Sequence, residues 1–288
     1  MSAQARQSGG AEIADQFSRD GFLSPIDVIS PAEAAEARAD LEAAESELAE
    51  DREKLALLRS YPDRLLPSFD RLIRHPKLLA AVTPILGSDL MVWSAGLFIK
   101  EAHSPKIVTW HQDLTYWGLD DAAEVTGWLA LSPVNTASGC MRFLPGSHHQ
   151  SQVSHNDSFD DNNLLSRGQE VAVEIDDAEG VNIELTPGQA SLHHGHLFHA
   201  SGPNTTGDRR IGAAIRYIRP SMRQTSGDKA LVALVNGRDA YDHFTVAGAP
   251  RGQLAAEDFA RCKADSAIKR RILYAGSRMQ KGQRYNTG

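Results

Sequence analysis

The sequence predicts a mainly β fold with flanking helices, in which the strands form an antiparallel sandwich or barrel. Several short segments rich in apolar, β-branched and aromatic residues follow one another along the middle of the chain, without helices between them. Turn signals such as Pro145-Gly146 and Pro187-Gly188 separate these segments. The predicted strands cover residues 90–100, 125–132, 140–144, 169–175, 181–185, 189–194 and 211–219.

Helices are predicted before the strands, and the first is a short one over residues 14–22. Ser30 and Glu33 are the ends of a capping box with Pro31 at the first helical position, which marks the start of a second helix. Ala, Glu and Leu dominate from there to residue 59, so we expect one long helix with a narrow apolar stripe and a charged face. A further helix is expected over residues 75–86, which makes residues 1–88 a helical N-terminal part.

The remaining segments are assigned from their composition. Residues 154–168 are polar and acidic, which predicts a long lid loop over one mouth of the β structure. Beyond residue 220 the chain is polar and irregular, and a helix over residues 257–274 is expected to close the fold. Because no repeat or linker divides the sequence, we expect a single domain over residues 1–288. Residues 89–220 form its β core and residues 221–288 its C-terminal extension.

Charge and hydropathy argue against several classes of protein. The 30 basic and 37 acidic residues give a formal net charge of −7, which disfavours broad nucleic-acid binding. No run approaches the roughly 18 apolar residues of a membrane span, and the first residues lack the apolar core of a signal peptide. Cys140 and Cys262 form no disulfide framework. We therefore expect a cytoplasmic protein with a small-molecule partner, no nucleic acid and no membrane; a homodimer through the N-terminal helix is left open.

A candidate metal site begins at Trp110-His111-Gln112-Asp113. Residues i and i+2 of a strand share a face, so His111 and Asp113 can offer an imidazole nitrogen and a carboxylate oxygen to one point. A second histidine would come from His193, His194, His196 or His199. Two histidines and a carboxylate are typical of non-haem Fe(II) oxygenases, but a zinc hydrolase uses the same ligands.

A pair of arginines favours the oxygenase. A turn follows His199, and Arg209-Arg210 then leads into an apolar strand. An oxygenase with a dicarboxylate cosubstrate needs a cationic partner for the far carboxylate, and the planar fork of arginine bonds both oxygens. One arginine of the pair is expected to serve this role, while the other lies at the surface.

With these residues in view, the chain resembles the phytanoyl-CoA dioxygenase family of Fe(II)/2-oxoglutarate oxygenases. Gly21-Phe22 is similar to the opening "DGF" block of the family, and His111-Gln112-Asp113 with Tyr116 resembles its first metal segment. The stretch from Ser138-Gly139-Cys140 to His148 resembles an "NGC…LPGSH" block, with Ser138 in place of Asn. His199-Ala200-Ser201-Gly202-Pro203-Asn204 and Arg210 resemble the distal histidine and the cosubstrate arginine.

The resemblance implies a double-stranded β-helix, or jelly roll, similar to the cupins. It implies Fe(II) held by His111, Asp113 and His199, with O2 as the oxidant. It also implies 2-oxoglutarate as cosubstrate, with its far carboxylate on Arg210. The positions that resemble further cosubstrate contacts are Lys100, Ser201 and Trp128.

The resemblance implies hydroxylation of an unactivated C–H bond with release of succinate and CO2. Halogenases of this superfamily lack the metal carboxylate, which Asp113 supplies here. Arg216 lies an even number of residues after Arg210 and shares its face on a regular strand, and Arg142 replaces an aliphatic residue of the family block. Either arginine would suit an anionic or zwitterionic metabolite of the amino-acid, betaine or phosphonate type. Gln112 and Tyr116 are also candidate substrate contacts, although Arg142 has a plain alternative as a solvent-facing strand residue.

Three alternatives stay open at the level of sequence. The first is an oxygenase that hydroxylates an acyl-CoA or lipid-like substrate, which would need a basic surface near the strand ends. The second is a zinc-dependent hydrolase with the same three ligands. The third is a jelly-roll binding protein without catalytic activity.

Overall fold

Two β-sheets face each other at the centre of the protein. The computed structural model describes residues 3–158, 160, 162–165 and 167–275. One sheet has the strand order β1-β9-β4-β11-β2-β12-β13, another has the order β3-β10-β5-β8, and β6 and β7 form a separate hairpin. The strands pair antiparallel except for β12 with β13. The larger sheet comprises β1 (Phe22–Asp27), β2 (Leu90–Lys100), β4 (Glu124–Ala130), β9 (Gln189–His194), β11 (Arg210–Ile218), β12 (Leu231–Asn236) and β13 (Thr245–Val246); the others are β3 (Val108–His111), β5 (Met141–Phe143), β6 (His155–Asp157), β7 (Gln169–Val171), β8 (Val181–Ile183) and β10 (His199–Ser201).

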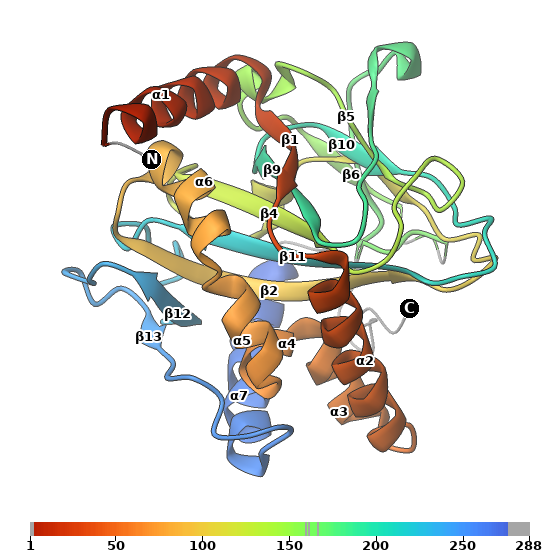
Figure 1. Cartoon of the computed structure of the whole chain (residues 1–288), viewed down its shortest axis with the longest axis vertical. Coiled ribbons are helices and arrows are strands. Elements are labelled where there is room, and N and C mark those ends of the chain that lie inside the picture. Colours follow the sequence, from red (N-terminus) through yellow and green to blue (C-terminus); the bar gives the residue numbers. More distant parts are fainter. Residues whose placement is uncertain (1–2, 159, 161, 166, 276–288) are drawn as a thin grey trace.

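Helices cover the outer face of the larger sheet. Figure 1 shows α2 to α5 and α7 on one side of β2 and β11, with the smaller sheet on the opposite side. Apolar residues of these helices and of the larger sheet form one continuous core. The helices are α1 (Ala3–Asp20), α2 (Pro31–Glu47), α3 (Arg52–Ser60), α4 (Pro62–Leu65), α5 (Pro67–Ile73), α6 (Pro76–Leu86) and α7 (Ala256–Leu273).

Strand β11 separates the helical core from the inner pocket. Its odd-numbered residues Ile211 and Ile215 belong to the core shared with the helices. Its even-numbered residues Arg210, Ala214 and Arg216 line a pocket between the two sheets. This alternation follows from the two-residue period of a strand, and it brings charged side chains to the inner face while the outer face stays apolar.

The long helix expected up to residue 59 is broken in the structure. The capping box at Ser30 and Glu33 forms as expected and starts α2, but α2 ends at Glu47. The carboxylate of Asp51 then accepts a hydrogen bond from the backbone N–H of Lys54 and starts α3. An aspartate at this point competes with the continuing helix for backbone donors, which explains the break.

Short strands differ most from the prediction. The helix expected over residues 14–22 ends at Asp20, and β1 follows at Phe22–Asp27, where Pro25 and polar residues hide the strand pattern. The strands β3 and β10 have only four and three residues and lack a visible alternation. The strand expected over residues 169–175 ends at Val171. The remaining predicted strands and the helices at 75–86 and 257–274 are present within a few residues of their predicted limits.

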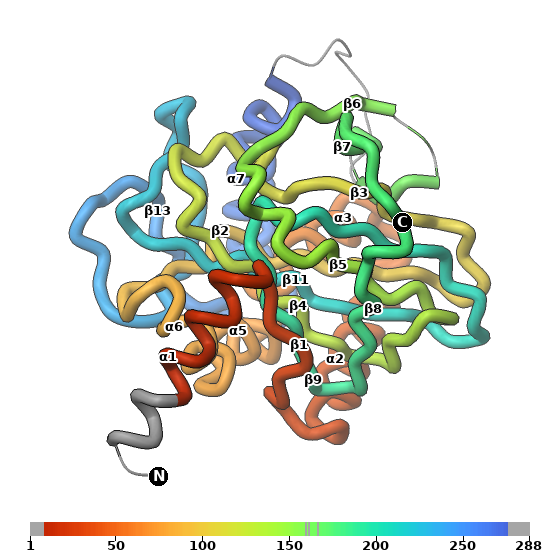
Figure 2. Tube along the Cα trace, turned by 90° about the horizontal axis from the view of Figure 1, so that it is seen from above, coloured from red at the N-terminus to blue at the C-terminus, as the bar shows by residue number. Residues whose placement is uncertain are grey.

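The segment predicted as a lid contains the first strand of a hairpin. Residues 155–157 form β6, which pairs with β7, while residues 159, 161 and 166 of this segment lie outside the described residues. Figure 2 shows this hairpin at the same end of the molecule as the end of α7. Arg167 joins the two, because its Nη1 donates a hydrogen bond of 2.9 Å to the carbonyl of Leu273. The last part of the predicted C-terminal extension, residues 276–288, also lies outside the described residues. Among the described helices, none is both long and apolar enough to cross a membrane.

Candidate active site

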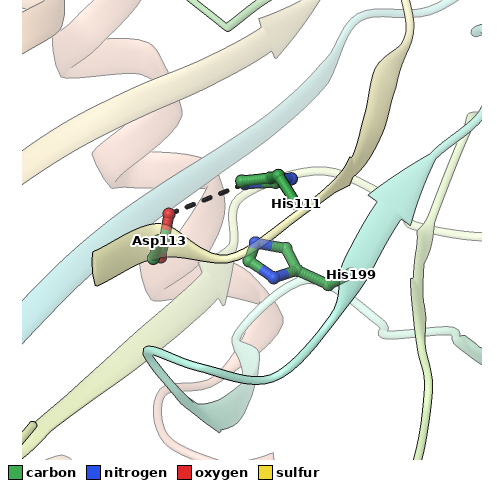
Figure 3. Close-up of side chains that lie close together, drawn as sticks. All are labelled: His111, Asp113 and His199. Carbon is green, nitrogen blue, oxygen red and sulfur yellow. Dashed lines mark ion pairs between the residues drawn. The ribbon is translucent and has the colours of Figure 1, made fainter. Parts of the chain in front are cut away.

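Two histidines and one aspartate meet where the smaller sheet faces the larger one. The register of β3 and β10 places His199 opposite His111. Asp113 lies at the start of a short 3-10 helix, Asp113–Tyr116, so the expectation that it shares a strand with His111 is wrong. The turn nevertheless brings its carboxylate back to the histidines. The ligand atoms of the three side chains all lie within 4.8 Å of one another (Figure 3), and His111 Nε2 is 3.7 Å from Asp113 Oδ1.

Backbone contacts orient both histidine rings. His111 Nδ1 lies 2.9 Å from the carbonyl of Thr109, and His199 Nδ1 lies 2.9 Å from the carbonyl of Leu197. A carbonyl accepts only from a protonated nitrogen, so each Nδ1 carries the proton and each Nε2 keeps a free lone pair. Burial, followed by the nearby His111, holds the pKa of His199 well below its ordinary value. This neutral form is the one that binds a metal ion.

Thr126 and His193 flank the second oxygen of Asp113. Thr126 Oγ1 donates a hydrogen bond of 3.2 Å to Asp113 Oδ2, and His193 Nε2 lies 3.5 Å from the same oxygen. Burial disfavours ionisation of Asp113, but the nearby imidazoles of His111 and His193 outweigh it and hold its pKa well below the ordinary value. Thr126 Oγ1 is also 2.7 Å from Glu124 Oε1. Burial, followed by the charge of Asp113, raises the pKa of Glu124 well above its ordinary value.

Arg210 lies at the far end of the same inner pocket. Its side chain is 2 % exposed, and its guanidinium carbon lies 5.2 Å from the centre of the Trp128 ring. Gly212 makes room for this ring, since a Cβ at that position would lie 1.8 Å from it. Arg210 Nε is buried and has no hydrogen-bond partner among the described residues. Burial lowers the pKa of Arg210 to about 10, which leaves the guanidinium charged at neutral pH.

Lys100 lies beside Arg210, because β2 and β11 pair with these two residues in register. Its Nζ donates a hydrogen bond of 2.6 Å to Ser201 Oγ. Among the described residues, no carboxylate lies within 4.0 Å of either cation. An uncompensated charge is costly to bury, so the charged Arg210, with the Lys100 amine beside it, indicates a site for an anion. The far carboxylate of a dicarboxylic acid fits this requirement.

An outer cavity of about 210 Å3 adjoins the inner pocket. The two share Phe98, Asp113 and Arg216, so a molecule in the outer cavity would lie next to the metal ligands. Helix α7 and the end of α3 supply part of its wall. Its aromatic lining consists of Tyr61, Trp93, Phe98, Tyr116, Trp117 and Tyr274.

The predicted substrate residues take different places. Tyr116 lines the outer cavity, and its hydroxyl donates a hydrogen bond of 3.1 Å to Asp157. Arg216 lines both cavities. Gln112 is fully buried; its amide nitrogen donates to the carbonyl of His196 at 2.8 Å, and its amide oxygen accepts from the backbone N–H of Val153 at 2.9 Å. Gln112 therefore fixes the surrounding backbone and lines neither cavity.

Arg142 lies outside both cavities. On β5 its neighbours Met141 and Phe143 point inward and are buried, so Arg142 points to the other face of the smaller sheet. There it bonds the backbone of Asp177, pairs with the carboxylate at 3.4 Å and lies over the Trp110 ring at 5.7 Å. The alternative of a solvent-facing strand residue matches this position, and we make no proposal of substrate contact for Arg142.

Comparison with known proteins identifies the family. The family model described as phytanoyl-CoA dioxygenase (PhyH) matches residues 17–212, which is more than half of the chain. The chain belongs to the phytanoyl-CoA dioxygenase family. The apo structure of the non-heme monooxygenase ThoJ superposes with a TM-score of 0.82 at 32 % identity, covering 91 % of this chain and 98 % of that one. The epimerase SnoN, solved with Fe3+ and alpha-ketoglutarate, superposes with a TM-score of 0.61 at 20 % identity and shares the fold, which confirms the jelly roll.

Curated relatives of this PhyH-family chain are more distant. The L-proline trans-4-hydroxylase of Streptomyces griseoviridis is 28 % identical over 168 residues, covering 52 % of this chain and 62 % of the relative. The ectoine dioxygenase of Bordetella parapertussis is 28 % identical over 153 residues, covering 49 % and 50 %. The matched region thus spans about half to three fifths of the length of these relatives.

Sequence reasoning missed several features of the candidate site. Thr126 lies two positions before Trp128 on a predicted strand, so the strand period already placed it on the inner face. His193 was a candidate metal ligand in the sequence, but its place beside Asp113 and opposite Thr126 follows only from the pairing of β4 and β9. Trp93 and Trp117 line the outer cavity through contacts with α7, and no local pattern indicates this packing.

Replacement of His193 is expected to weaken metal binding in this PhyH-family protein. His193 is 1 % exposed and contacts the oxygen of Asp113 that faces away from His111. His193→Phe removes this contact, and we expect Fe(II) affinity to fall about tenfold or more, as for other residues behind a metal ligand. His193→Gln keeps an amide donor and is expected to lose less. Calorimetric titration with Fe(II) in the absence of oxygen measures the affinity of each variant, and His196→Phe is a control outside the pocket. Equal Fe(II) affinities for all variants would contradict the expected role of His193.

Binding of the expected cosubstrate should take up a proton at Lys100. Burial, followed by the charge of Arg210, lowers the pKa of Lys100 to about 6, so its amine is mostly neutral at pH 8. A bound anion favours the ammonium form and raises this pKa. Affinity for 2-oxoglutarate should therefore fall as the pH rises from about 6 toward the raised pKa, with uptake of up to about one proton at pH 8. Arg210 and Cys140 also face Lys100, but both titrate at higher pH.

Calorimetry of 2-oxoglutarate binding in buffers with different ionisation enthalpies measures this proton uptake. Lys100→Met should abolish the buffer dependence. Heats of binding that are the same in every buffer for the unaltered protein would show that Lys100 is already protonated and would contradict the expectation.

Proposed function

We propose that this chain is an Fe(II)- and 2-oxoglutarate-dependent dioxygenase that hydroxylates an unactivated C–H bond of a small molecule. The observation that carries the proposal is that His111, Asp113 and His199 line one pocket together with Arg210, a buried cation without an acidic partner among the described residues, and that Lys100 lies beside Arg210. A zinc hydrolase would need the metal ligands but not the buried cation. A simple binding protein would need the cavity but not the metal ligands. Products of the reaction would be the hydroxylated substrate, succinate and CO2.

The donor set suits the metal and the cosubstrate. Two neutral imidazoles and one carboxylate would hold Fe(II) and leave positions for other ligands. Arg210 and Lys100 would bind the far carboxylate of 2-oxoglutarate, with Ser201 and Trp128 beside them. When bound, iron and 2-oxoglutarate together supply the oxidising power that activates O2. The chain orients these groups: Thr126 and His193 direct Asp113, and the backbone carbonyls fix the two histidine rings.

The names of the relatives support a small substrate. Proteins named for proline, ectoine and hypophosphite are similar to this chain, and all three names denote small molecules. We propose an anionic or zwitterionic metabolite, with Arg216 and Tyr116 as contacts, because Arg216 lies where the outer cavity meets the metal ligands. A cytoplasmic location and a homodimer through the N-terminal helix stay predictions.

Succinate release tests the proposed function. Protein loaded with Fe(II) without oxygen is mixed with 2-oxoglutarate, O2 and a panel of small carboxylates, amino acids, betaines and phosphonates. We expect succinate to form only with both Fe(II) and 2-oxoglutarate, and to increase with the true substrate. Absence of succinate throughout, together with a metal-dependent hydrolytic activity when zinc is supplied, would favour the hydrolase instead.

A further inference from the structure

Cations and aromatic rings alternate along one wall of the outer cavity. The Arg216 guanidinium lies 5.1 Å from the centre of the Trp117 ring. Trp117 stacks on Trp93 with ring centres 5.0 Å apart and an angle of 24° between planes. On α7, Lys269 places its Nζ 4.8 Å from the centre of the Trp93 ring. The stack therefore fixes Arg216 at the end of the wall that is nearest to the metal ligands.

Two hydrogen-bond donors of this wall lack a partner in the described part of the chain. Arg216 Nε and Trp93 Nε1 are both buried and make no hydrogen bond there. Arg216 Nη1 reaches only Ser94 Oγ, at 3.5 Å, and none of the described carboxylates lies within 4.0 Å of its guanidinium. Lys269 differs, because Asp265 pairs with it at 2.9 Å. Arg216 is thus the cation of this wall that still needs an anion, and the unpaired donors call for acceptor oxygens.

The remaining lining of the cavity indicates what carries the anion. Phe98 and Tyr116 line the cavity of about 210 Å3 together with Trp117. Flat side chains of this kind pack well against a flat ring, with offset or edge-to-face contacts.

We propose that the outer cavity binds the prime substrate as a small carboxylate carried on a flat ring, with the carboxylate on Arg216 and the ring against Trp117 and Trp93. Because Arg216 and Asp113 line both cavities, the carbon next to the carboxylate lies beside the metal ligands. The assignment of this molecule as the substrate rests on the proposed function, but its binding is a separate property of the cavity.

Binding of model acids tests the proposal. The full chain, loaded with Ni(II) and 2-oxoglutarate to prevent turnover, is titrated calorimetrically with phenylacetate and indole-3-carboxylate, and with phenylacetamide and cyclohexylacetate as probes without the charge or the flat ring. At least one aromatic acid is expected to bind, the amide about tenfold or more weakly, and the saturated acid several-fold more weakly. Failure of both aromatic acids to bind would overturn the proposal.

Variants of Arg216 test whether this residue contacts the carboxylate of the ligand. Arg216→Gln should lower the affinity for the aromatic acid about tenfold or more, while Arg216→Lys, which keeps the charge but not the planar fork, should lose less. Arg142→Gln is the matched control, because Arg142 also lies over an indole ring but outside both cavities, and its affinity should stay within about twofold. Unchanged binding in Arg216→Gln, or in Arg216→Lys if the glutamine variant does not fold, would overturn the proposal.

The two proposals fail separately. If succinate release depends on Fe(II) and 2-oxoglutarate but neither aromatic acid binds, the substrate class is wrong and the proposed function stands. If an aromatic acid binds through Arg216 but no condition yields succinate, the cavity assignment stands and the proposed function is wrong.

Discussion

Asp113→Ala should remove both iron binding and activity. Asp113 supplies the carboxylate of the candidate metal site, and its replacement leaves two histidines at the end of a pocket that has lost its negative charge. Loss of residues behind a metal ligand costs about 10–100-fold in affinity, so loss of the ligand itself should cost at least about 100-fold. Calorimetry with Fe(II) and succinate release measure the two effects. In addition, Fe(II) should raise the melting temperature of the unaltered protein but not that of the variant.

Asp177→Ala is the control for Asp113→Ala. Asp177 is an exposed carboxylate paired with Arg142 on the outer face of the smaller sheet, so its removal should leave Fe(II) affinity within about twofold. Asp113→Ala protein that binds Fe(II) as tightly as the control would show that the metal, if one binds, lies elsewhere.

Arg210→Met should abolish productive binding of 2-oxoglutarate. Loss of one partner of a buried charge pair costs about 2–5 kcal/mol, which corresponds to a rise in the KM for 2-oxoglutarate of roughly 30-fold to several thousand-fold. The variant should nevertheless fold well. Arg210 is buried without an acidic partner within 4.0 Å in the described part of the chain, so methionine removes an uncompensated charge, and the melting temperature without cosubstrate should not fall.

Arg209→Met is the matched control for this prediction. Arg209 precedes Arg210 in the sequence, but its guanidinium pairs with Glu45 at 2.9 Å and Glu101 at 2.8 Å on the helical side of the sheet. Its loss should cost about 1 kcal/mol or less of stability and leave the KM for 2-oxoglutarate unchanged. Equal KM values for the two variants would contradict the assignment of Arg210.

Local pattern predicted the parts of the structure that a single segment determines. The strand period of β11 placed Arg210 and Arg216 on one face, and the structure shows both lining the inner pocket. The capping box at Ser30 and the helix at residues 257–274 are equally local features. The break of the long helix at Asp51 also has a local cause, but a helix-capping aspartate looks the same as an exposed helical one until the chain is folded.

Features that depend on packing between distant segments could not be predicted from the sequence. The strand period does not say which face of β5 points inward. A substrate contact was therefore expected of both Arg142 and Arg216, although of these two only Arg216 lines a cavity. Gln112 lies between the candidate metal ligands His111 and Asp113, yet its amide bonds to backbone groups rather than facing a cavity. The outer cavity exists because α7 returns to the sheet, and no segment alone encodes that contact.

Titration of 2-oxoglutarate into Fe(II)-loaded protein without oxygen tests the metal site and Arg210 together. We expect one molecule bound per chain, with affinity that depends on the metal, is lost in Arg210→Met and is kept in Arg209→Met. Failure of the loaded protein to bind 2-oxoglutarate, or equal binding by the two arginine variants, would contradict this expectation.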